Sequence, residues 1–445
     1  MLQMSYVSAS FFFWLPSSSP KPEPLHAGSG RRGQSCGRES GANIRTHIPL
    51  LTREGIMSPA TIMVSLLALW FSLAPTSAYG AGMDSDSRTN ELEHIFRNLT
   101  EDQSPGAAIL VRENGKTSFR RGYGVRDLRT RRAIDSQTNF RLASCTKQFT
   151  AMAIMLLVHD GKLRYDERLT DIFPEFPDYG KAITLRNLLN HTSGLPDYES
   201  LMDQIPQGPT RWTKNRQIHD PEVLALVEGQ KSGKFRPGTQ WSYSNSGYVI
   251  LGLVVAKVSG KPFEDFLEER LFAPLKMNHT LAYVRGKNEV PDRAYGYSKQ
   301  GDVFAETDQS ATSATLGDGG VYSNLEDLAK WDDALTHHAL LGPNEMRPAL
   351  TPVKLADGSL PKWAGDPDDS NPQTGQLVSY GFGWFLDDYR GHERMWHYGD
   401  TTGFKTVIER FKDETLTIIV LSNRSDLNPQ SLALQVANVY LSPPK

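Results

Sequence analysis

The pattern of apolar and polar positions divides the chain into two strand-rich ends and a helical middle. Segments of strand length with apolar or alternating residues lie near the two ends, at 107–111, 117–123, 380–386, 406–411 and 415–421. Asn114-Gly115, between the first two, is a strong signal for a two-residue hairpin turn. Residues 412–414 are expected to form the turn between the last two strands.

Helical periodicity dominates between these groups of strands. The helices predicted there are a segment from 144 to a stop at Gly161, and 183–189, 221–226, 248–258 and 325–335. Two more, at 89–99 and 429–440, lie near the ends. We therefore predict an α/β (α+β) fold in which both chain ends form one antiparallel sheet. Terminal helices flank this sheet, and a mostly helical region is inserted at about 160–340.

The first 80 residues have a different character. Residues 1–56 are rich in Ser, Pro, Gly and Arg without a sustained period, so we predict a disordered extension and hypothesise that translation starts at Met57. The apolar run 61–74 is shorter than the roughly 20 residues of a membrane span. Its length suits a secretory signal, so 57–80 is predicted to be a signal peptide. The folded domain, 88–441, is then secreted or periplasmic, or membrane-anchored if the signal stays uncleaved.

Composition and charge narrow the choice of partners. Hydrophobic residues make up 39% and charged residues 22% of the chain, with a net charge of −3 and no basic block, so nucleic-acid binding is not expected. The two cysteines, Cys36 and Cys145, do not suggest a disulfide framework. Because paired-cysteine and His-x-x-Glu-His patterns are missing and His337-His338 is interpreted as a surface pair, we expect no metal and no cofactor.

The first candidate for chemistry is Ser144 with Lys147 at the start of a predicted helix. Residues three apart lie on one helix face, with Cβ atoms about 5–6 Å apart. A lysine held neutral by its surroundings can take the serine hydroxyl proton and make the serine a nucleophile. The pattern is weak alone, since Ser18 and Lys21 have the same spacing.

A second pattern, Tyr-Ser-Asn, occurs at Tyr243 to Asn245 and again at Tyr322 to Asn324. A buried phenol near a lysine can relay protons, and an Asn amide can orient a substrate carbonyl. At the second copy, Asn324 or Ser323 is better interpreted as the cap of the following helix. A capping role for Ser246 is the alternative at the first copy.

The third candidate is His397, which we place just before a strand. Gly399 and Gly403 follow it, and glycines let a ligand approach the backbone closely. A lone histidine is more often structural than catalytic, so His397 is a candidate catalytic residue only in combination with the other two motifs.

Together these pieces resemble the active-site set of the serine β-lactamase and penicillin-binding protein superfamily. The chain is most similar to the class C β-lactamase-related branch, which includes D-amino-acid peptidases and esterases. The resemblance covers about 88–441 and includes Leu-Asn-His-Thr-Ser-Gly-Leu at 189–195. Each motif is common, but their order and spacing together are specific.

The resemblance implies a role for each residue. Ser144 would be the acylated nucleophile and Lys147 its proton acceptor. Tyr243 would pass a proton to the leaving group and help to activate the deacylating water, and Asn245 would hold the acyl side of the substrate. His397 takes the place of the lysine in the Lys-Thr-Gly motif of many β-lactamases.

The oxyanion hole would be formed by the backbone N–H groups of Ser144 and Asp400, next to Gly399. The carboxylate of Asp400 is unfavourable there unless its side chain turns away. With an unperturbed pKa of about 6.5, His397 is mostly neutral at pH 7 and lacks the fixed charge that attracts a penicillin carboxylate.

These expectations describe a serine hydrolase, of carboxypeptidase or esterase type, that forms a covalent acyl-enzyme. Its substrate would be an ester, an amide or a D-amino-acid-containing peptide. The alternatives are a β-lactamase and a non-catalytic penicillin-binding or regulatory protein. Cys145 points about 100° away from Ser144 around a helix and is expected to be a small core residue.

Overall fold

The computed structural model describes residues 85–99, 103–206, 208–363 and 376–442. The predictions for residues 1–56 and 57–80 lie outside these residues. Within the described ranges, every helix is too short or too polar to cross a lipid bilayer.

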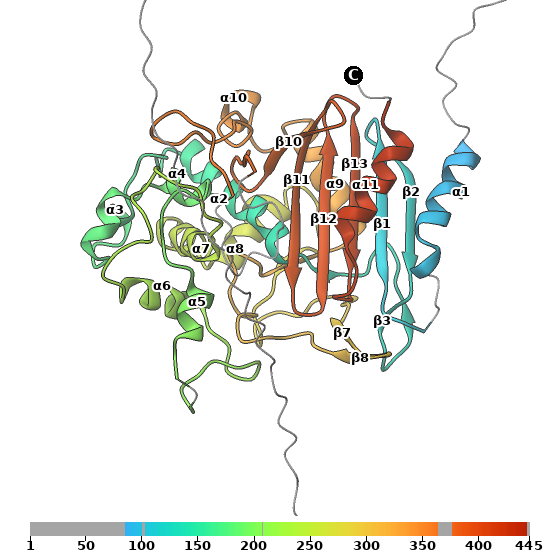
Figure 1. Cartoon of the computed structure of the whole chain (residues 1–445), viewed down its shortest axis with the longest axis horizontal. Coiled ribbons are helices and arrows are strands. Elements are labelled where there is room, and N and C mark those ends of the chain that lie inside the picture. Colours follow the sequence, from blue (N-terminus) through green and yellow to red (C-terminus); the bar gives the residue numbers. More distant parts are fainter. Residues whose placement is uncertain (1–84, 100–102, 207, 364–375, 443–445) are drawn as a thin grey trace, which may run out of the picture. The chain divides into compact units, whose positions relative to one another are not determined.

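The centre of the fold is a six-stranded antiparallel sheet made from both ends of the chain, in the order β10-β11-β12-β13-β1-β2 (Figure 1). Its strands are β1 (Ala107–Glu113), β2 (Lys116–Tyr123), β10 (Phe385–Tyr389), β11 (His392–Thr401), β12 (Phe404–Phe411) and β13 (Leu416–Ser422). β1 pairs with β13 along its whole length, from Ala107 opposite Ser422 to Glu113 opposite Leu416. The predicted antiparallel sheet from both chain ends is confirmed.

The hairpin between β1 and β2 has the predicted turn. Asn114 and Gly115 both have positive φ angles, 53° and 73°, as a two-residue turn that matches strand twist requires. β1 and β13 are almost continuously apolar because both faces of the sheet are covered.

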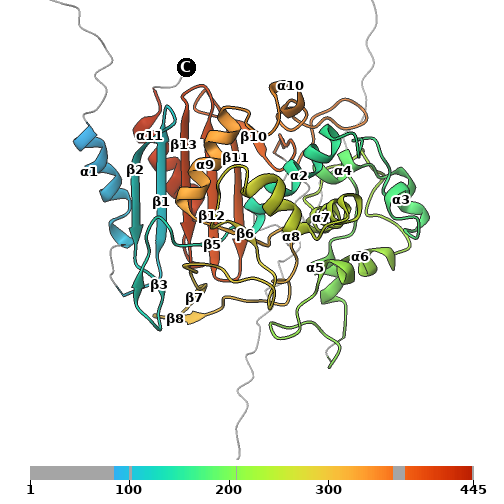
Figure 2. The same cartoon turned by 180° about the vertical axis from the view of Figure 1, so that it is seen from behind.

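Helices cover both faces of this sheet. α1 (Ser85–Ile95) and α11 (Pro429–Tyr440) lie on one face, where Leu92, Val420 and Val436 share one apolar cluster. α9 (Leu325–Thr336) lies on the other face (Figures 1 and 2). These are the predicted helices near the two ends and the one at 325–335.

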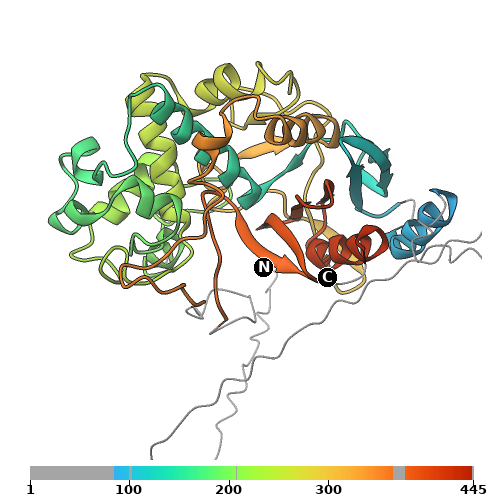
Figure 3. The ribbon, with the colours of Figure 1, turned by 90° about the horizontal axis from the view of Figure 1, so that it is seen from above.

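A mostly helical region lies beyond the β10 edge of the sheet, away from β2 (Figures 1 and 3), and it extends past the insertion predicted at about 160–340 at both ends. Its helices and helical turns are η2 (Ala143–Thr146), α2 (Lys147–His159), α3 (Leu169–Ile172), η3 (Asp178–Ala182), α4 (Leu185–Leu189), α5 (Tyr198–Asp203), α6 (Asp220–Glu228), α7 (Asn245–Ser259), α8 (Phe263–Leu267), η4 (Glu268–Phe272) and α10 (Pro343–Met346). α2 and α7 are its buried centre.

Short strands also occur outside the main sheet. They are β3 (Val125–Asp127) with β4 (Arg132–Ala133), β5 (Phe140–Arg141) with β9 (Val321–Ser323) and β6 (Leu281–Ala282), and β7 (Tyr297–Gln300) with β8 (Val303–Glu306); η1 (Arg97–Leu99) follows α1. The sequence pattern predicted none of these strands, because two to four residues are too few to establish a period.

Two strand predictions were wrong. Residues 380–384 are not in a strand, since Gly383 takes φ +77° and the buried rings of Tyr380 and Trp384 belong to a loop. β11 was missed, so His397 lies within a ten-residue strand rather than before one. Its charged residues and Gly399 obscure the alternation, and pairing with β10 and β12 on both sides forms the strand.

Candidate active site

Ser144 lies in a 3₁₀ turn, η2, that leads into α2, so it precedes the α-helix instead of opening it. The preceding Ala143 has φ +47°, a left-handed conformation that is costly for a residue with a Cβ. Ser144 is partly exposed, whereas Lys147, the first residue of α2, is fully buried. Lys147 Nζ nevertheless lies 3.0 Å from Ser144 Oγ.

Strand β11 supports this turn through close contacts. A Cβ on Gly399 would lie 2.1 Å from the Leu142 carbonyl oxygen, so only glycine fits. Thr406 Oγ1 on β12 donates a hydrogen bond of 2.8 Å to the same oxygen. Cys145 is fully buried with Sγ 3.3 Å from the His397 carbonyl, and burial raises the pKa of its thiol to about 12. The predicted core role of Cys145 is confirmed.

Lys147 has three partners at hydrogen-bond distance. Its Nζ lies 3.0 Å from Ser144 Oγ, 2.8 Å from Asn245 Oδ1 and 3.0 Å from the Asp318 carbonyl oxygen. Burial lowers the pKa of Lys147 to about 8, against the opposing effect of nearby acids, the largest from Asp318. A neutral amine has two N–H donors for Asn245 and Asp318 and one lone pair for the proton of Ser144. The site is thus arranged for a lysine acting as a base.

Tyr243 and Asn245 flank the N-terminus of α7. The cap of this helix is Ser244, whose side chain accepts a hydrogen bond from the Gly247 N–H. The capping alternative had named Ser246, which is wrong; Ser246 Oγ donates to the Pro196 carbonyl instead. The cap holds Asn245 against Lys147 and places the Tyr243 ring 4.8 Å from Lys147 Nζ.

The Tyr243 hydroxyl is buried and lies close enough to Ser144 for the serine side chain to lower the pKa of Tyr243. Burial dominates, however, and raises the pKa of Tyr243 well above 10. The hydroxyl makes no hydrogen bond of ordinary geometry within the described residues. It is therefore a protonated phenol whose O–H is left for a substrate.

The second Tyr-Ser-Asn copy has the predicted capping role. The Asn324 side chain accepts a hydrogen bond of 2.9 Å from the Asp327 N–H at the start of α9. Tyr322 is fully buried and accepts a hydrogen bond from Arg293.

His397 is fully buried beside Tyr243, with ring centroids 6.1 Å apart. Its Nδ1 donates to the Tyr398 carbonyl at 2.7 Å, so Nε2 accepts from the Tyr380 hydroxyl at 3.1 Å. Burial, with a smaller effect from the Lys147 cation, lowers the pKa of His397 to about 3. The residue is thus a neutral imidazole and cannot replace a fixed cation.

His191 is a site residue to which the sequence analysis gave no role. It takes φ +63°, and its Nδ1 accepts the backbone N–H of Ser244 at 3.1 Å. Its ring lies 4.4 Å from the Tyr243 ring, and burial lowers its pKa well below 6.5. His191 therefore helps to position Tyr243 by packing against its ring and by holding the next backbone N–H. The only sequence signal was its place within the quoted 189–195 segment.

Asp400 turns its carboxylate away from Ser144, which is the orientation that an oxyanion hole at its backbone N–H needs. Side chains alternate along β11, so Asp400 points to the face opposite Gly399 and pairs with Lys405 at 3.0 Å. Its backbone remains beside the Ser144 turn, because the adjacent Gly399 contacts Ala143.

Acidic residues also lie close enough to Lys147 to raise its pKa. Glu199 on α5 and Asp400 on β11 line one cleft of about 380 Å³. Burial of the carboxyl, with Asp197 and then Asp318 nearby, raises the pKa of Glu199 to about 7, although other atoms of the side chain face solvent. Asp318 is buried, and its Oδ2 accepts from the Tyr198 hydroxyl at 3.1 Å.

Comparisons with known proteins identify the family of the chain. The family profile described as Beta-lactamase matches residues 92–439. Penicillin-binding protein 4* of Bacillus subtilis (strain 168) is 30% identical over 355 residues, covering 76% of this chain and 73% of that protein.

Solved structures share the fold. A penicillin binding protein from Bacillus halodurans is similar with a TM-score of 0.61 and 26% identity, over 78% of this chain and 97% of that one. D-amino acid amidase from Ochrobactrum anthropi SV3 is similar with a TM-score of 0.63 and 24% identity, over 79% and 97%. Since the family profile covers well over half of the sequence, the chain belongs to the beta-lactamase family, among the hydrolases of the serine β-lactamase and penicillin-binding protein superfamily.

Proposed function

We propose that this protein is a serine hydrolase that forms an acyl-enzyme at Ser144 and acts on amides or esters of substrates that carry a free amine. The observation that carries the proposal is the buried Lys147 amine, 3.0 Å from Ser144 Oγ with a pKa lowered to about 8. An amine with this pKa is partly neutral at physiological pH and can act as a general base.

The reaction begins when Lys147 takes the Ser144 proton and Oγ attacks the substrate carbonyl. Backbone N–H groups of Ser144 and Asp400 stabilise the developing oxyanion, a contribution of about 3–4 kcal/mol per donor in other enzymes. Tyr243 gives its proton to the leaving group and recovers one from Lys147. Water then cleaves the ester bond to Ser144, releasing the acid, and the serine proton is restored. Asn245 orients the acyl side through its amide N–H.

The charges around the site support an amine-bearing substrate. The neutral His397 supplies no cation for a substrate carboxylate. Glu199, Asp197 and Asp318 instead place negative charge close enough to Lys147 to raise its pKa. An ammonium bound in the cleft beside Glu199 would be stabilised. The structural likeness to a D-amino acid amidase agrees with such a substrate.

The test measures acylation and turnover for a matched panel of compounds. Free D- and L-phenylalanine amides, N-acetyl-D-phenylalanine amide, a p-nitrophenyl ester and a chromogenic cephalosporin are offered to wild type, Ser144→Ala and Cys145→Ala. Intact-mass spectrometry is expected to find an adduct on wild type and Cys145→Ala but none on Ser144→Ala. Turnover that survives in Ser144→Ala would refute the mechanism.

Substrate preference is tested with Glu199→Gln. Removing this carboxylate is expected to raise KM for the free amides about fivefold, the scale of one partly exposed ion pair, without affecting the N-acetyl amide. Asp203→Asn is the control, because Asp203 lines the same cleft but pairs with Arg211. A preference for the N-acetyl amide would contradict the amine assignment. Rapid cephalosporin turnover would favour the β-lactamase alternative, and labelling without any turnover the penicillin-binding one.

A further inference from the structure

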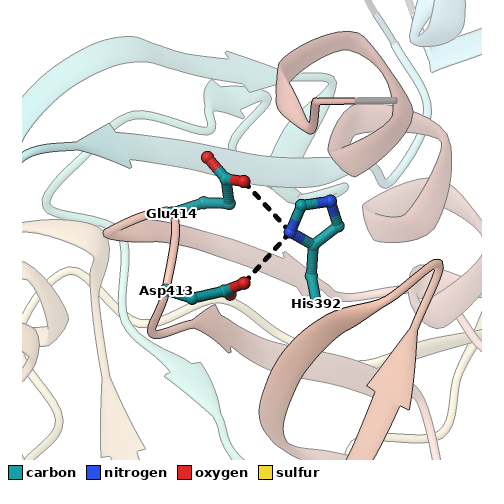
Figure 4. Close-up of side chains that lie close together, drawn as sticks. All are labelled: His392, Asp413 and Glu414. Atoms are coloured by element: carbon teal, nitrogen blue, oxygen red, sulfur yellow. Dashed lines mark hydrogen bonds and ion pairs between the residues drawn. The ribbon is translucent and has the colours of Figure 1, made fainter. Parts of the chain in front are cut away.

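A second cluster of ionisable side chains lies at the opposite end of β11 from the candidate active site. His392 is the first residue of β11, and Asp413 and Glu414 are in the turn between β12 and β13 (Figure 4). His392 Nδ1 lies 3.2 Å from Asp413 Oδ2 and 3.0 Å from Glu414 Oε1. His397 is five positions after His392, about 17 Å along a strand, so this cluster is independent of the proposed reaction.

The other ring nitrogen determines what Nδ1 can do. His392 Nε2 faces the backbone carbonyl of Ser442, after α11, at 3.4 Å, and this oxygen can only accept a hydrogen bond. Nε2 therefore carries a proton. In a neutral imidazole Nδ1 then presents a lone pair to two carboxylate oxygens, so three electron-rich atoms converge. Only a cation between them, a proton or a metal ion, makes this arrangement favourable.

The separations suit a metal ion. Zinc binds imidazole nitrogen and carboxylate oxygen at about 2.0–2.2 Å, which places the ligand atoms of a tetrahedral site about 3.3 Å apart. The three ligand atoms of this cluster all lie within 4.8 Å of one another. A carbonyl that holds the second ring nitrogen is also the usual support for a metal-bound histidine.

A metal ion could reach this cluster from solvent, and the nearest basic residue in the turn pairs elsewhere. The His392 side chain is 0% exposed, whereas those of Asp413 and Glu414 are 25% and 24% exposed, so an ion can enter from solvent. Lys412, the basic residue of the same turn, pairs with Glu393 instead.

We propose that His392, Asp413 and Glu414 form a structural site for a divalent transition-metal ion, with zinc the best match to one nitrogen and two carboxylate ligands. The ion would tie the start of β11 to the β12–β13 turn, close to the end of α11. Short motifs in the sequence do not reveal such a site, because one ligand comes from the start of β11 and the other two from the turn between β12 and β13. The site departs from the sequence expectation of no metal.

The test is calorimetric titration of the chelator-treated protein with Zn²⁺, together with thermal unfolding. Wild type is expected to bind one Zn²⁺ per chain with a raised unfolding midpoint. Asp413→Asn/Glu414→Gln keeps the side-chain shapes and is expected to weaken binding at least about tenfold. Its ligands are partly exposed, so this variant avoids the folding risk of replacing buried His392.

The control is His159→Gln, which removes a surface histidine that pairs with one carboxylate, Glu345, and should leave binding unchanged. Ser144→Ala should bind Zn²⁺ like wild type, which separates this proposal from the proposed function. An absence of saturable binding, or binding unaffected by Asp413→Asn/Glu414→Gln, would overturn the proposal of a metal site at these three residues.

Discussion

The depressed pKa of Lys147 predicts how acylation depends on pH. Only the neutral amine can accept the Ser144 proton. With a pKa of about 8, roughly a tenth of Lys147 is neutral at pH 7 and half at pH 8. Acylation by a neutral ester should therefore rise about fivefold from pH 7 to 8 and level off above pH 9.

The lowered pKa of Lys147 also predicts how the free energy of unfolding depends on pH. A change from 10.5 to about 8 is about 3 kcal/mol of preference for the neutral amine in the folded state. Because the folded-state pKa is below the unfolded value, the unfolded chain binds more protons between the two. The free energy of unfolding of wild type relative to Lys147→Met should therefore rise by about this amount as pH increases from about 8 to 10.5.

The assay is stopped-flow release of p-nitrophenol from an uncharged ester between pH 6 and 9.5. An uncharged ester avoids the titration of Glu199, whose pKa of about 7 would alter the binding of an amine. Ser144→Ala should show no burst. In Glu199→Gln the inflection should move to lower pH, because the Glu199 carboxylate raises the pKa of Lys147. A burst rate that stays constant from pH 6.5 to 9 would refute the assignment of Lys147 as the base.

Three further substitutions test other parts of the account. Tyr243→Phe should slow amide hydrolysis by about 10²–10⁴-fold but ester hydrolysis much less, because an amine leaving group needs the proton; kcat for both substrates measures this. Gly399→Ala places a Cβ 2.1 Å from the Leu142 carbonyl and should lower stability by about 1–3 kcal/mol in urea denaturation. Asp332→Ala leaves the buried Arg112 and the partly buried Arg410 without their shared partner, so the free energy of unfolding should fall by about 3–5 kcal/mol in the same denaturation assay.

The sheet and the long helices could be predicted because local pattern and tertiary structure agree there. Asn114 and Gly115 favour the positive φ angles of a two-residue turn whatever surrounds them. The helix predicted at 429–440 is α11. β11 could not be predicted, since its residues include three charged side chains and a glycine. What makes it a strand is hydrogen bonding to β10 and β12, which depends on distant parts of the chain.

The candidate site was only partly predictable for a similar reason. Motif order predicted the candidate residues Ser144, Lys147, Tyr243, Asn245 and His397, and the fold places them close together. The third partner of Lys147 is a backbone carbonyl, that of Asp318, and a carbonyl has no side-chain signature. The effect of Glu199 is electrostatic and depends on how α5 packs beside α7.

One electrostatic balance connects the features of the site. Burial favours a neutral Lys147, while Asp318, Glu199 and Asp197 favour its charged form, and the resulting pKa is about 8. A fixed cation in place of His397 would lower the pKa of Lys147 further and attract carboxylates; the neutral imidazole leaves the acids as the dominant charges. An ammonium bound beside Glu199 would offset the charge that keeps Lys147 protonated. Binding of an amine-bearing substrate would thus promote release of the Lys147 proton and prepare the base for its own reaction.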